Sequence, residues 1–237
     1  MKKFWAEQWP IIMQNVIAAT KQTGARLIFF DNVYMYGLVE GKMTEETPDQ
    51  PSSKKGKIRA KTAEALMDEV KAGNIRASIL RAADFYGAAA SANSVFDSMV
   101  LAKYAKKGSA LWLGNPAKLH SFTYVPDAGK ALFLLGQNPQ SDNQIWHAPT
   151  ASALTGKQFI ELAANVYQTK PKFSAINKLM LRLIGIFSST TAAAVEMFYQ
   201  YDHDYVFDST KFEKFFKVEP TAYETGFQEL KNTLFKA

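Results

Sequence analysis

Two short polar segments hold the side chains best suited to chemistry. One spans residues 31–36 and the other spans residues 83–86, and each directly follows a run of apolar residues. Carboxylate, amide and phenol groups can hydrogen-bond a hydroxyl or carbonyl oxygen, and the ionisable ones can transfer a proton. The first candidates for a site are therefore Asp31, Asn32, Tyr34, Asp84 and Tyr86.

A third candidate segment is basic. The chain carries a formal net charge of +6, and the excess of basic residues lies within residues 1–120. The densest cluster has no acid inside it and consists of Lys54, Lys55, Lys57, Arg59 and Lys61. Such a cluster can bind phosphate, nucleic acid or an anionic surface. The cluster can equally be a solvent-exposed loop followed by the first turn of a helix, with no ligand.

The apolar patterns predict the elements that would position these residues. Residues 4–23 and 58–71 have apolar side chains at helical spacing. The runs at residues 26–30 and 77–81 are continuous, which is typical of strands covered on both faces. Helix, strand and loop occur in that order twice, which predicts an α/β fold with parallel strands. Ligands of such sheets bind at the carboxyl ends of the strands, where both polar segments would lie.

The rest of the chain predicts shorter elements. Residues 38–58 are polar and predict a long loop, Thr155 is expected to cap a helix, and Asp127 is expected to cap another. The expected strands are 110–113, 121–125 and 144–147. The expected helices are 94–107, 126–135, 155–167, 174–201, 208–216 and 223–235.

Composition excludes several classes of protein. A chain of 237 residues with 47% hydrophobic content can bury a core without covalent staples. The lack of cysteine excludes disulfides, cysteine-containing zinc sites and cysteine catalysis, and it fits a reducing cytoplasm. The pair His203 and Asp204 lacks a third ligand at helical spacing, so no metal site is expected. Residues 176–195 contain Lys178 and Arg182, which favours an amphipathic lid helix over a membrane span.

Four segments, in order, resemble a known family. They read RLIFFDNVYMYG, TEETPDQPSSKKGKIRAKTAEAL, IRASILRAADFYG and HSFTYVPDAGKALFLL. This series resembles the extended short-chain dehydrogenase/reductase family, and more closely its atypical members of the NAD-dependent epimerase/dehydratase type. The resemblance implies a partial Rossmann-type parallel sheet with helices on both faces, plus a smaller C-terminal α+β substrate domain. The first would occupy residues 1–90 and the second residues 91–237, with residues 121–136 packing back on the Rossmann part.

The resemblance also implies a chemistry and a set of catalytic positions. Members of the family exchange a hydride between NAD or NADP and a hydroxyl carbon, often of a nucleotide-linked sugar. The position of the family's Ser or Thr falls on Asn32, five residues before a glycine. Its Tyr-x-x-x-Lys pair falls either on Lys55 and Arg59 or on Lys57 and Lys61, and neither register supplies a tyrosine. The implied catalytic residues are Asn32, Tyr34, Lys55 and Arg59.

The cofactor and substrate sites follow from the same resemblance. No G-x-G-x-x-G or G-x-x-x-x-G-K-S/T spacing occurs in this sequence, and the family's glycine motif would precede the segment at residues 4–23. The implied cofactor-binding residues are Asp31, Arg81, Ala83, Asp84 and Tyr86, and the implied substrate residues are His120, Tyr124 and His147. Arg81 can instead be a structural ion pair, and each histidine can be a bystander.

The expected partners are a small-molecule substrate, neither nucleic acid nor membrane, and a second copy of the chain. Residues 26–30 would form an exposed sheet edge, and such edges promote self-association. The missing tyrosine leaves an alternative open, in which the protein is a non-catalytic dinucleotide sensor or regulatory binder of the same fold.

Overall fold

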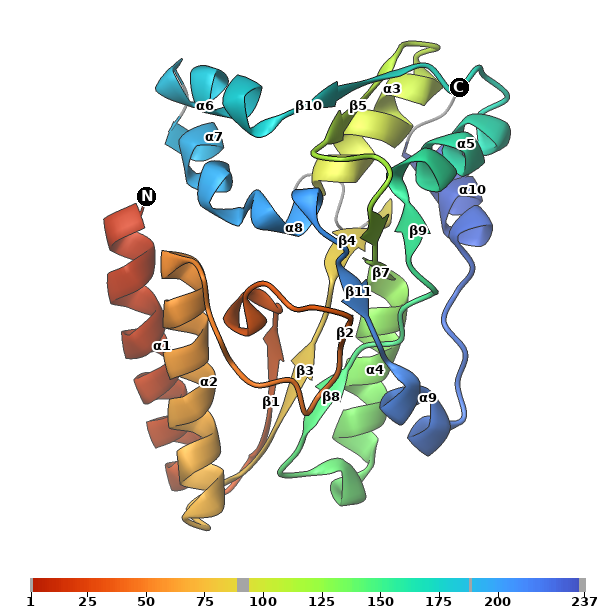
Figure 1. The fold of residues 1–237 in the computed structure, drawn as a ribbon. Coiled ribbons are helices and arrows are strands. Elements are labelled where there is room, and N and C mark those ends of the chain that lie inside the picture. The colour runs from red at the N-terminus through yellow and green to blue at the C-terminus, as the bar shows by residue number, and fades with distance from the viewer. Residues whose placement is uncertain (1, 89–93, 188, 235–237) are drawn as a thin grey trace.

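A three-stranded parallel sheet lies at the centre of the lower half of the molecule (Figure 1). The computed structural model describes residues 2–88, 94–187 and 189–234. The sheet has the order β1-β3-β8, formed by β1 (Arg26–Asp31), β3 (Arg76–Arg81) and β8 (Ile145–His147). Asp31 pairs in register with Arg81, so the carboxyl ends of β1 and β3 are adjacent. The predicted α/β fold with a parallel sheet is confirmed.

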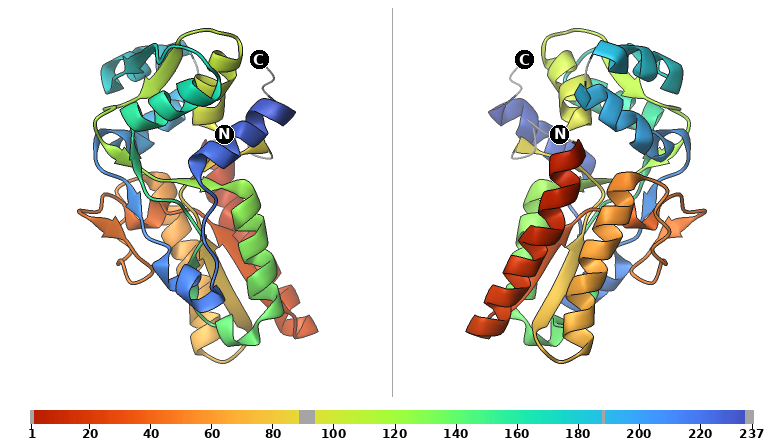
Figure 2. Two further views of the ribbon diagram at one scale, coloured as in Figure 1. Left: turned by 90° about the vertical axis from the view of Figure 1, so that its right-hand side faces the viewer. Right: turned by 90° about the vertical axis from the view of Figure 1, so that its left-hand side faces the viewer.

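Helices cover both faces of this sheet (Figures 1 and 2). On one face lie α1 (Lys2–Thr23) and α2 (Lys54–Lys71), whose buried side chains Met13 and Leu66 belong to one cluster with Ile79. On the other face lies α4 (Val125–Gln137), whose buried leucine shares a cluster with Leu80 and Trp146. Burial on both faces explains why the strand sequences are continuously apolar.

The remaining elements form the upper half, around a second core rich in aromatic side chains. Its strand pairs are β4 (Asp84–Tyr86) with β7 (Phe122–Tyr124), β5 (Ala110–Leu113) with β10 (Phe173–Ile176), and β6 (Leu119–His120) with β9 (Leu154–Thr155). A further pair, β2 (Lys42–Met43) with β11 (Val206–Phe207), lies beside the central sheet. The helices of this half are a π-helical turn at Asp97–Leu101, α3 (Ala102–Ala105), α5 (Gly156–Val166), α6 (Lys178–Phe187), α7 (Ser189–Ala194), α8 (Tyr199–Asp202) and α10 (Tyr223–Thr233). Helix α9 (Thr210–Phe216) lies lower, beside β8 (Figure 1), where its Phe212 packs in the core of the central sheet.

Three of the sequence-based expectations are wrong in detail. The predicted helix at 174–201 begins with strand β10, because pairing with β5 overrides the local helical pattern. The predicted loop at 38–58 contains β2 and the first residues of α2, since the Ser53 hydroxyl accepts the Gly56 N–H at 2.9 Å and starts the helix early. The Asp127 carboxylate does not cap its helix but accepts from the backbone N–H and the hydroxyl of Thr221, at 2.7 and 2.9 Å.

Other expectations hold. Thr155 caps α5 in a capping box with Gln158. The helices predicted at 208–216 and 223–235 correspond to α9 and α10, although residue 235 lies outside the described residues.

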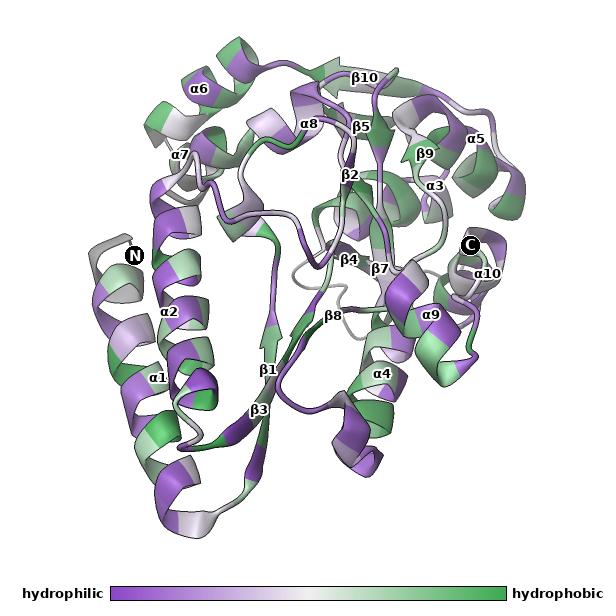
Figure 3. Cartoon of the chain, turned by 60° about the horizontal axis from the view of Figure 1, so that its bottom comes forward, coloured by the Kyte–Doolittle hydropathy of each residue, from purple (hydrophilic) through white to green (hydrophobic). Residues whose placement is uncertain are grey.

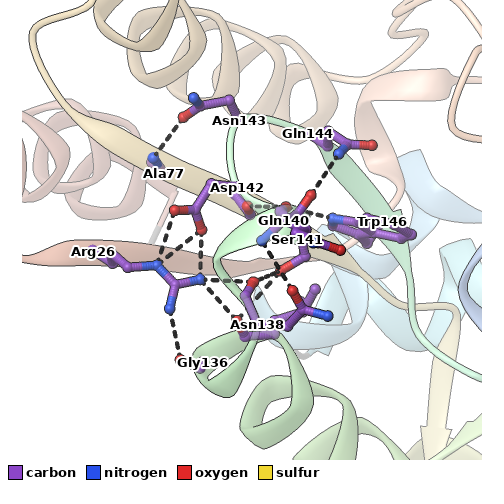
Figure 4. Close-up of polar contacts among 12 residues, drawn as sticks. Arg26, Ala77, Gly136, Asn138, Gln140, Ser141, Asp142, Asn143, Gln144 and Trp146 are labelled. Carbon is purple, nitrogen blue, oxygen red and sulfur yellow. Dashed lines mark hydrogen bonds and ion pairs between the residues drawn. The ribbon is translucent and has the colours of Figure 1, made fainter. Parts of the chain in front are cut away.

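One arginine joins the lower end of the sheet to the helix behind it (Figure 4). The Arg26 guanidinium pairs with the Asp142 carboxylate at 2.5 Å and donates to three backbone carbonyls at or just beyond the end of α4. A cation at a helix C-terminus is favoured by the helix dipole. The contact therefore links β1, the end of α4 and the turn that precedes β8.

We expect Arg26→Ala to lower the free energy of unfolding by about 2–3 kcal/mol, since it leaves a partly buried carboxylate and several carbonyls without their donor. Urea denaturation measures the change. Arg76, its exposed register partner on β3, is the matched control, and Arg76→Ala is expected to change stability by less than about 0.5 kcal/mol. Equal effects of the two variants would show that the contacts of the Arg26 guanidinium do not stabilise the fold.

Strand β1 is an edge of the described sheet. Its Phe30 side chain is 37% exposed and contacts the Phe85 ring, with ring centroids 5.6 Å apart. Self-association through this edge remains a prediction, which light scattering tests.

Candidate functional site

The first polar segment turns sharply at the carboxyl end of β1. The side-chain oxygen of Asn32 accepts the backbone N–H of Tyr34 at 3.0 Å, which is an Asx turn. A short 3-10 turn at Tyr34–Tyr36, called the η1 turn below, follows and ends at Gly37 with φ of 71°. Asn32 and Tyr34 are both half-buried, so this turn presents an amide and a phenol at the edge of the sheet.

The first turn of α2 packs directly against the η1 turn. A Cβ atom at Gly56 would lie 2.3 Å from the Tyr34 carbonyl oxygen, so only glycine allows this close approach. The neighbouring Lys55 is half-buried and is thereby brought next to the turn. Three of the four predicted catalytic residues, Asn32, Tyr34 and Lys55, therefore lie on adjoining segments.

The fourth, Arg59, lies deeper. Its side chain is about one turn further along α2 and is 8% exposed, with its guanidinium 3.3 Å from the Asp31 carboxylate and 3.9 Å from the centre of the Trp9 ring. Burial raises the pKa of Asp31 to about 6 although Arg59 and Arg81 oppose the shift. Burial likewise lowers the pKa of Arg59, against the effect of Asp31. The two residues form a buried ion pair behind the turn.

The second polar segment adds a carboxylate. Asp84 accepts from His120 Nε2 at 3.0 Å and from the Tyr201 hydroxyl at 3.3 Å. The His120 ring is stacked against the rings of Tyr205 and Tyr201, with centroids 4.4 and 5.4 Å apart. Because a carboxylate only accepts, Nε2 of His120 carries the hydrogen.

Electrostatics connect the two segments. The pKa of Tyr34 is raised, first by burial and next by the Asp84 carboxylate, while Arg59 opposes the shift. Asp84, His120 and Tyr201 therefore form a hydrogen-bonded group, and Tyr34 lies within electrostatic range of its carboxylate. We call Tyr34, Asp84 and His120 together the Tyr34–Asp84 cluster.

The predicted residues Arg81 and His147 belong to a separate buried network. Arg81 is 2% exposed, lies 3.4 Å from the Asp49 carboxylate and stacks over the Tyr36 ring at 4.6 Å. The Tyr36 hydroxyl donates to His147 Nε2 at 2.7 Å, because Nδ1 of that histidine already donates to the Asp208 carbonyl oxygen at 2.7 Å. Burial lowers the pKa of His147 to about 3. This histidine is neutral, and the network fixes the end of the sheet.

Three further predicted residues are buried in the interior, namely Ala83, Tyr86 and Tyr124. The Ala83 N–H donates to Thr123 Oγ1 at 3.0 Å. The Tyr86 ring is fully buried and packs on Tyr124, with centroids 5.1 Å apart, while the Tyr124 hydroxyl donates to Glu229. As placed, these residues contribute packing, and their assignment to cofactor or substrate remains a prediction.

Aromatic side chains close the space around the cluster. A hollow between residues 37–43 and 199–206 measures about 10 Å³, which is room for one water at most. The hollow beside His120 and Tyr201 has no such room. A larger cavity of about 350 Å³ lies elsewhere and is lined by Lys42, Thr150, Ser209 and Glu213 among others. Neither of the two hollows beside the cluster has room for a substrate or a dinucleotide.

Sequence reasoning missed several of these residues. The tyrosines at 199–205 are among them, since the Tyr201 hydroxyl donates to Asp84 and the Tyr205 ring stacks on His120. Asp49 sits in a polar loop with no distinguishing spacing, so no signal pointed to its contact with Arg81. Among the described residues no group of three histidine or acidic side chains could hold a metal ion.

Comparison with known proteins identifies the family. The profile of the NAD dependent epimerase/dehydratase family matches residues 4–147, which include both polar segments and the basic segment. The chain belongs to this family. The resemblance inferred from the four sequence segments is confirmed.

A curated relative also resembles this chain. The chain is 28% identical over 150 residues to a dTDP-6-deoxy-L-talose 4-dehydrogenase (NAD(P)(+)) of Kitasatospora kifunensis, covering 61% of this chain and 47% of the relative. The chain thus spans about half the length of the curated relative it matches.

Solved structures extend the likeness to the fold. A dTDP-glucose 4,6-dehydratase from Bacillus anthracis in complex with NAD superposes with a TM-score of 0.75 at 14% identity, covering 98% of this chain and 70% of that one. A UDP-glucose 4-epimerase from Thermus thermophilus in complex with NAD gives 0.74 at 15% identity, covering 95% and 69%. At these identities the likeness shows the fold, and it confirms the Rossmann-type architecture of the epimerase/dehydratase family. Within the described ranges no helix has the length and apolar character needed to cross a bilayer.

Proposed function

We propose that the Tyr34–Asp84 cluster is the substrate-binding part of an NAD(P)-dependent site, acting on a nucleotide-linked sugar or another small substrate with a hydroxyl or carbonyl carbon. The observation that carries the proposal is the in-register pairing of Asp31 with Arg81 at the carboxyl ends of two parallel strands, because the segments with Tyr34 and Asp84 follow these ends, where ligands of this fold class bind. Both residues lie within the segment that matches the epimerase/dehydratase family. Relatives whose names include nucleotide sugars and NAD support the substrate and cofactor classes.

The residues present fit the cofactor only in part. Asn32, Tyr34, Lys55 and Asp84 are partly exposed and offer groups that can hydrogen-bond a ribose hydroxyl or a carboxamide. Arg81, Ala83 and Tyr86 are buried and already paired or packed, and none of the cavities described near the cluster has room for a dinucleotide. NAD(P) would supply the hydride acceptor when bound. The roles below concern the substrate oxygen alone.

Tyr34 serves as a hydrogen-bond donor to that oxygen. Its raised pKa keeps the phenol protonated at neutral pH, so it donates rather than abstracts a proton. Lys55, next to the turn, provides a positive charge beside the same oxygen. Asp84 and His120 form a hydrogen-bonded pair behind Tyr34 that can accept and pass on a proton.

A second candidate function is a non-catalytic binder of the same fold. The specific observation that favours it is the buried Asp31–Arg59 pair. In one register Arg59 occupies the position of the family's lysine, which would lower the pKa of a catalytic tyrosine. The positive charge of Arg59 is instead compensated by Asp31, and the pKa of Tyr34 stays raised.

Binding and turnover measurements distinguish the two candidates. NAD(H) binding is measured by calorimetry, and turnover is followed by NADH absorbance on a panel of nucleotide sugars and aldehydes. We expect Tyr34→Phe to lower turnover by about 10²-fold or more, while Tyr167→Phe, a buried tyrosine in the aromatic core, leaves it unchanged. Dinucleotide binding without turnover of any substrate would favour the binder. Absence of both binding and turnover would overturn both candidates.

A further inference from the structure

Helix α6 exposes an unusual amount of apolar surface. Of the 13 large hydrophobic side chains that are exposed in the described part of the chain, five lie on this ten-residue helix. They are Leu179 (65% exposed), Met180 (45%), Leu183 (56%), Ile184 (48%) and Ile186 (72%). Soluble monomers rarely leave such a contiguous patch uncovered, and patches of this kind mark interaction sites.

The opposite side of α6 anchors it to the molecule. Leu181 is 6% exposed and clusters with Leu113 and Phe198. Gly185 faces α7 so closely that a Cβ atom there would lie 3.1 Å from the Ala192 Cα. The two helices lie at the rim of the molecule (Figures 1 and 3). A lid would bury the apolar arc over the site, whereas here the arc faces outward.

The charges on α6 have a single sign. Lys178 and Arg182 are four residues apart, so they lie one above the other along one edge of the apolar arc, and both are exposed. The segment from residue 177 to residue 195 contains no aspartate or glutamate. A short helix with an exposed apolar arc and basic residues along its edge is the pattern of helices that lie in a membrane interface.

We propose that α6 docks this protein on the surface of a bilayer that contains anionic lipid. The arc of Leu179, Leu183 and Ile186 would enter the boundary between headgroups and acyl chains. Lys178 and Arg182 would contact lipid phosphates beside it. This is contact with one leaflet and no crossing, since α6 is only about 15 Å long. The proposal differs from the sequence-based expectation that no membrane is a partner.

The charge pattern disfavours a second copy of the chain as the occupant. A two-fold contact uses the same patch on both copies, so it would bring Lys178 and Arg182 of both copies to one interface. Neither α6 nor α7 supplies an acid to pair with them, and like charges brought together oppose association. An anionic bilayer offers both an apolar layer and negative headgroups.

Vesicle co-sedimentation tests the proposal with the full chain. We expect binding to phosphatidylcholine vesicles that contain phosphatidylserine, weakening as salt rises. The double variant Leu183→Ser/Ile186→Ser should reduce binding at least about tenfold. Lys178→Gln/Arg182→Gln should remove the preference for phosphatidylserine. Phe133→Ser is the matched control, since Phe133 is 65% exposed on α4, and it should bind like the unchanged chain.

Three outcomes would overturn the proposal. The unchanged chain could fail to bind any vesicle, or the double serine variant could bind as well as the unchanged chain. Light scattering could also show a dimer that the double serine variant dissociates, which would make the arc a protein interface. Circular dichroism of each variant establishes that it is folded, and the readout does not depend on turnover.

Discussion

The Asp97→Asn variant should be more stable than the unchanged protein by about 4 kcal/mol at about pH 8. Asp97 is fully buried in the π-helical turn, and its Oδ2 accepts the Gly87 N–H at 3.1 Å. Burial raises its pKa to about 7, although the hydrogen bonds from Gly87 and Ser94 oppose the shift. Folding therefore places an ionised carboxylate in the interior at high pH, and an asparagine of the same shape removes that cost.

The sign of the pH dependence follows from the raised pKa. Between about pH 4 and pH 7 the folded state holds a proton on Asp97 that the unfolded state has released, so this group makes stability fall as pH rises through that window. The advantage of the asparagine variant should therefore shrink as pH falls and be nearly gone at about pH 4.

Urea denaturation at several pH values measures the advantage of Asp97→Asn. Asp68→Asn is the control, because Asp68 is an exposed acid on α2, and its effect should stay within about 0.5 kcal/mol at every pH. An Asp97→Asn variant that is less stable at high pH, or whose advantage does not depend on pH, would show that Asp97 is not ionised inside the fold.

The Gly56→Ala variant should lose about 3 kcal/mol of stability, together with the placement of Tyr34. The added methyl group would lie 2.3 Å from the Tyr34 carbonyl oxygen and 2.9 Å from Cβ of Pro51. The first of these contacts is with backbone, so a side-chain rotation cannot relieve it. The η1 turn and the first turn of α2 must separate, and any activity that depends on Tyr34 and Lys55 should fall with them.

Gly129→Ala provides the matched control. Gly129 lies within α4, and a methyl group there would meet nothing within 4 Å. Because alanine favours the helix, this variant should gain about 0.5–1 kcal/mol. Thermal unfolding compares the two variants. If Gly56→Ala were as stable as Gly129→Ala, the close approach of α2 to the η1 turn would be absent in solution.

Much of the architecture could be predicted from local sequence. The apolar runs that became β1 and β3 are continuous because helices cover both faces of the sheet, and that continuity is visible in the residues themselves. Thr155 and Gln158 indicate the start of α5, because a capping box is formed by residues three apart. By contrast, the local pattern places residues 174–176 in a helix, whereas their parallel pairing with β5 makes them part of strand β10.

The position of the candidate site could be predicted from the sequence, but the roles of its residues could not. The two polar segments lie side by side, as expected for the ends of neighbouring parallel strands. Arg81 and His147 were expected to face ligands, yet they are buried in contacts with Asp49 and Tyr36, residues that are distant along the chain. The sequence spacing of Arg81 and His147 gives no indication of these contacts.

The sequence by itself therefore determined the parallel α/β class, the family and the two segments where chemistry can occur. These depend on short-range patterns of apolar, glycine and polar residues. Only the tertiary structure decided that Arg59 is held by Asp31, that His120 joins Asp84, and that α6 turns its apolar side outward. Burial and partner choice fix the charge and exposure of a side chain, and both arise from residues far apart in sequence that folding brings together.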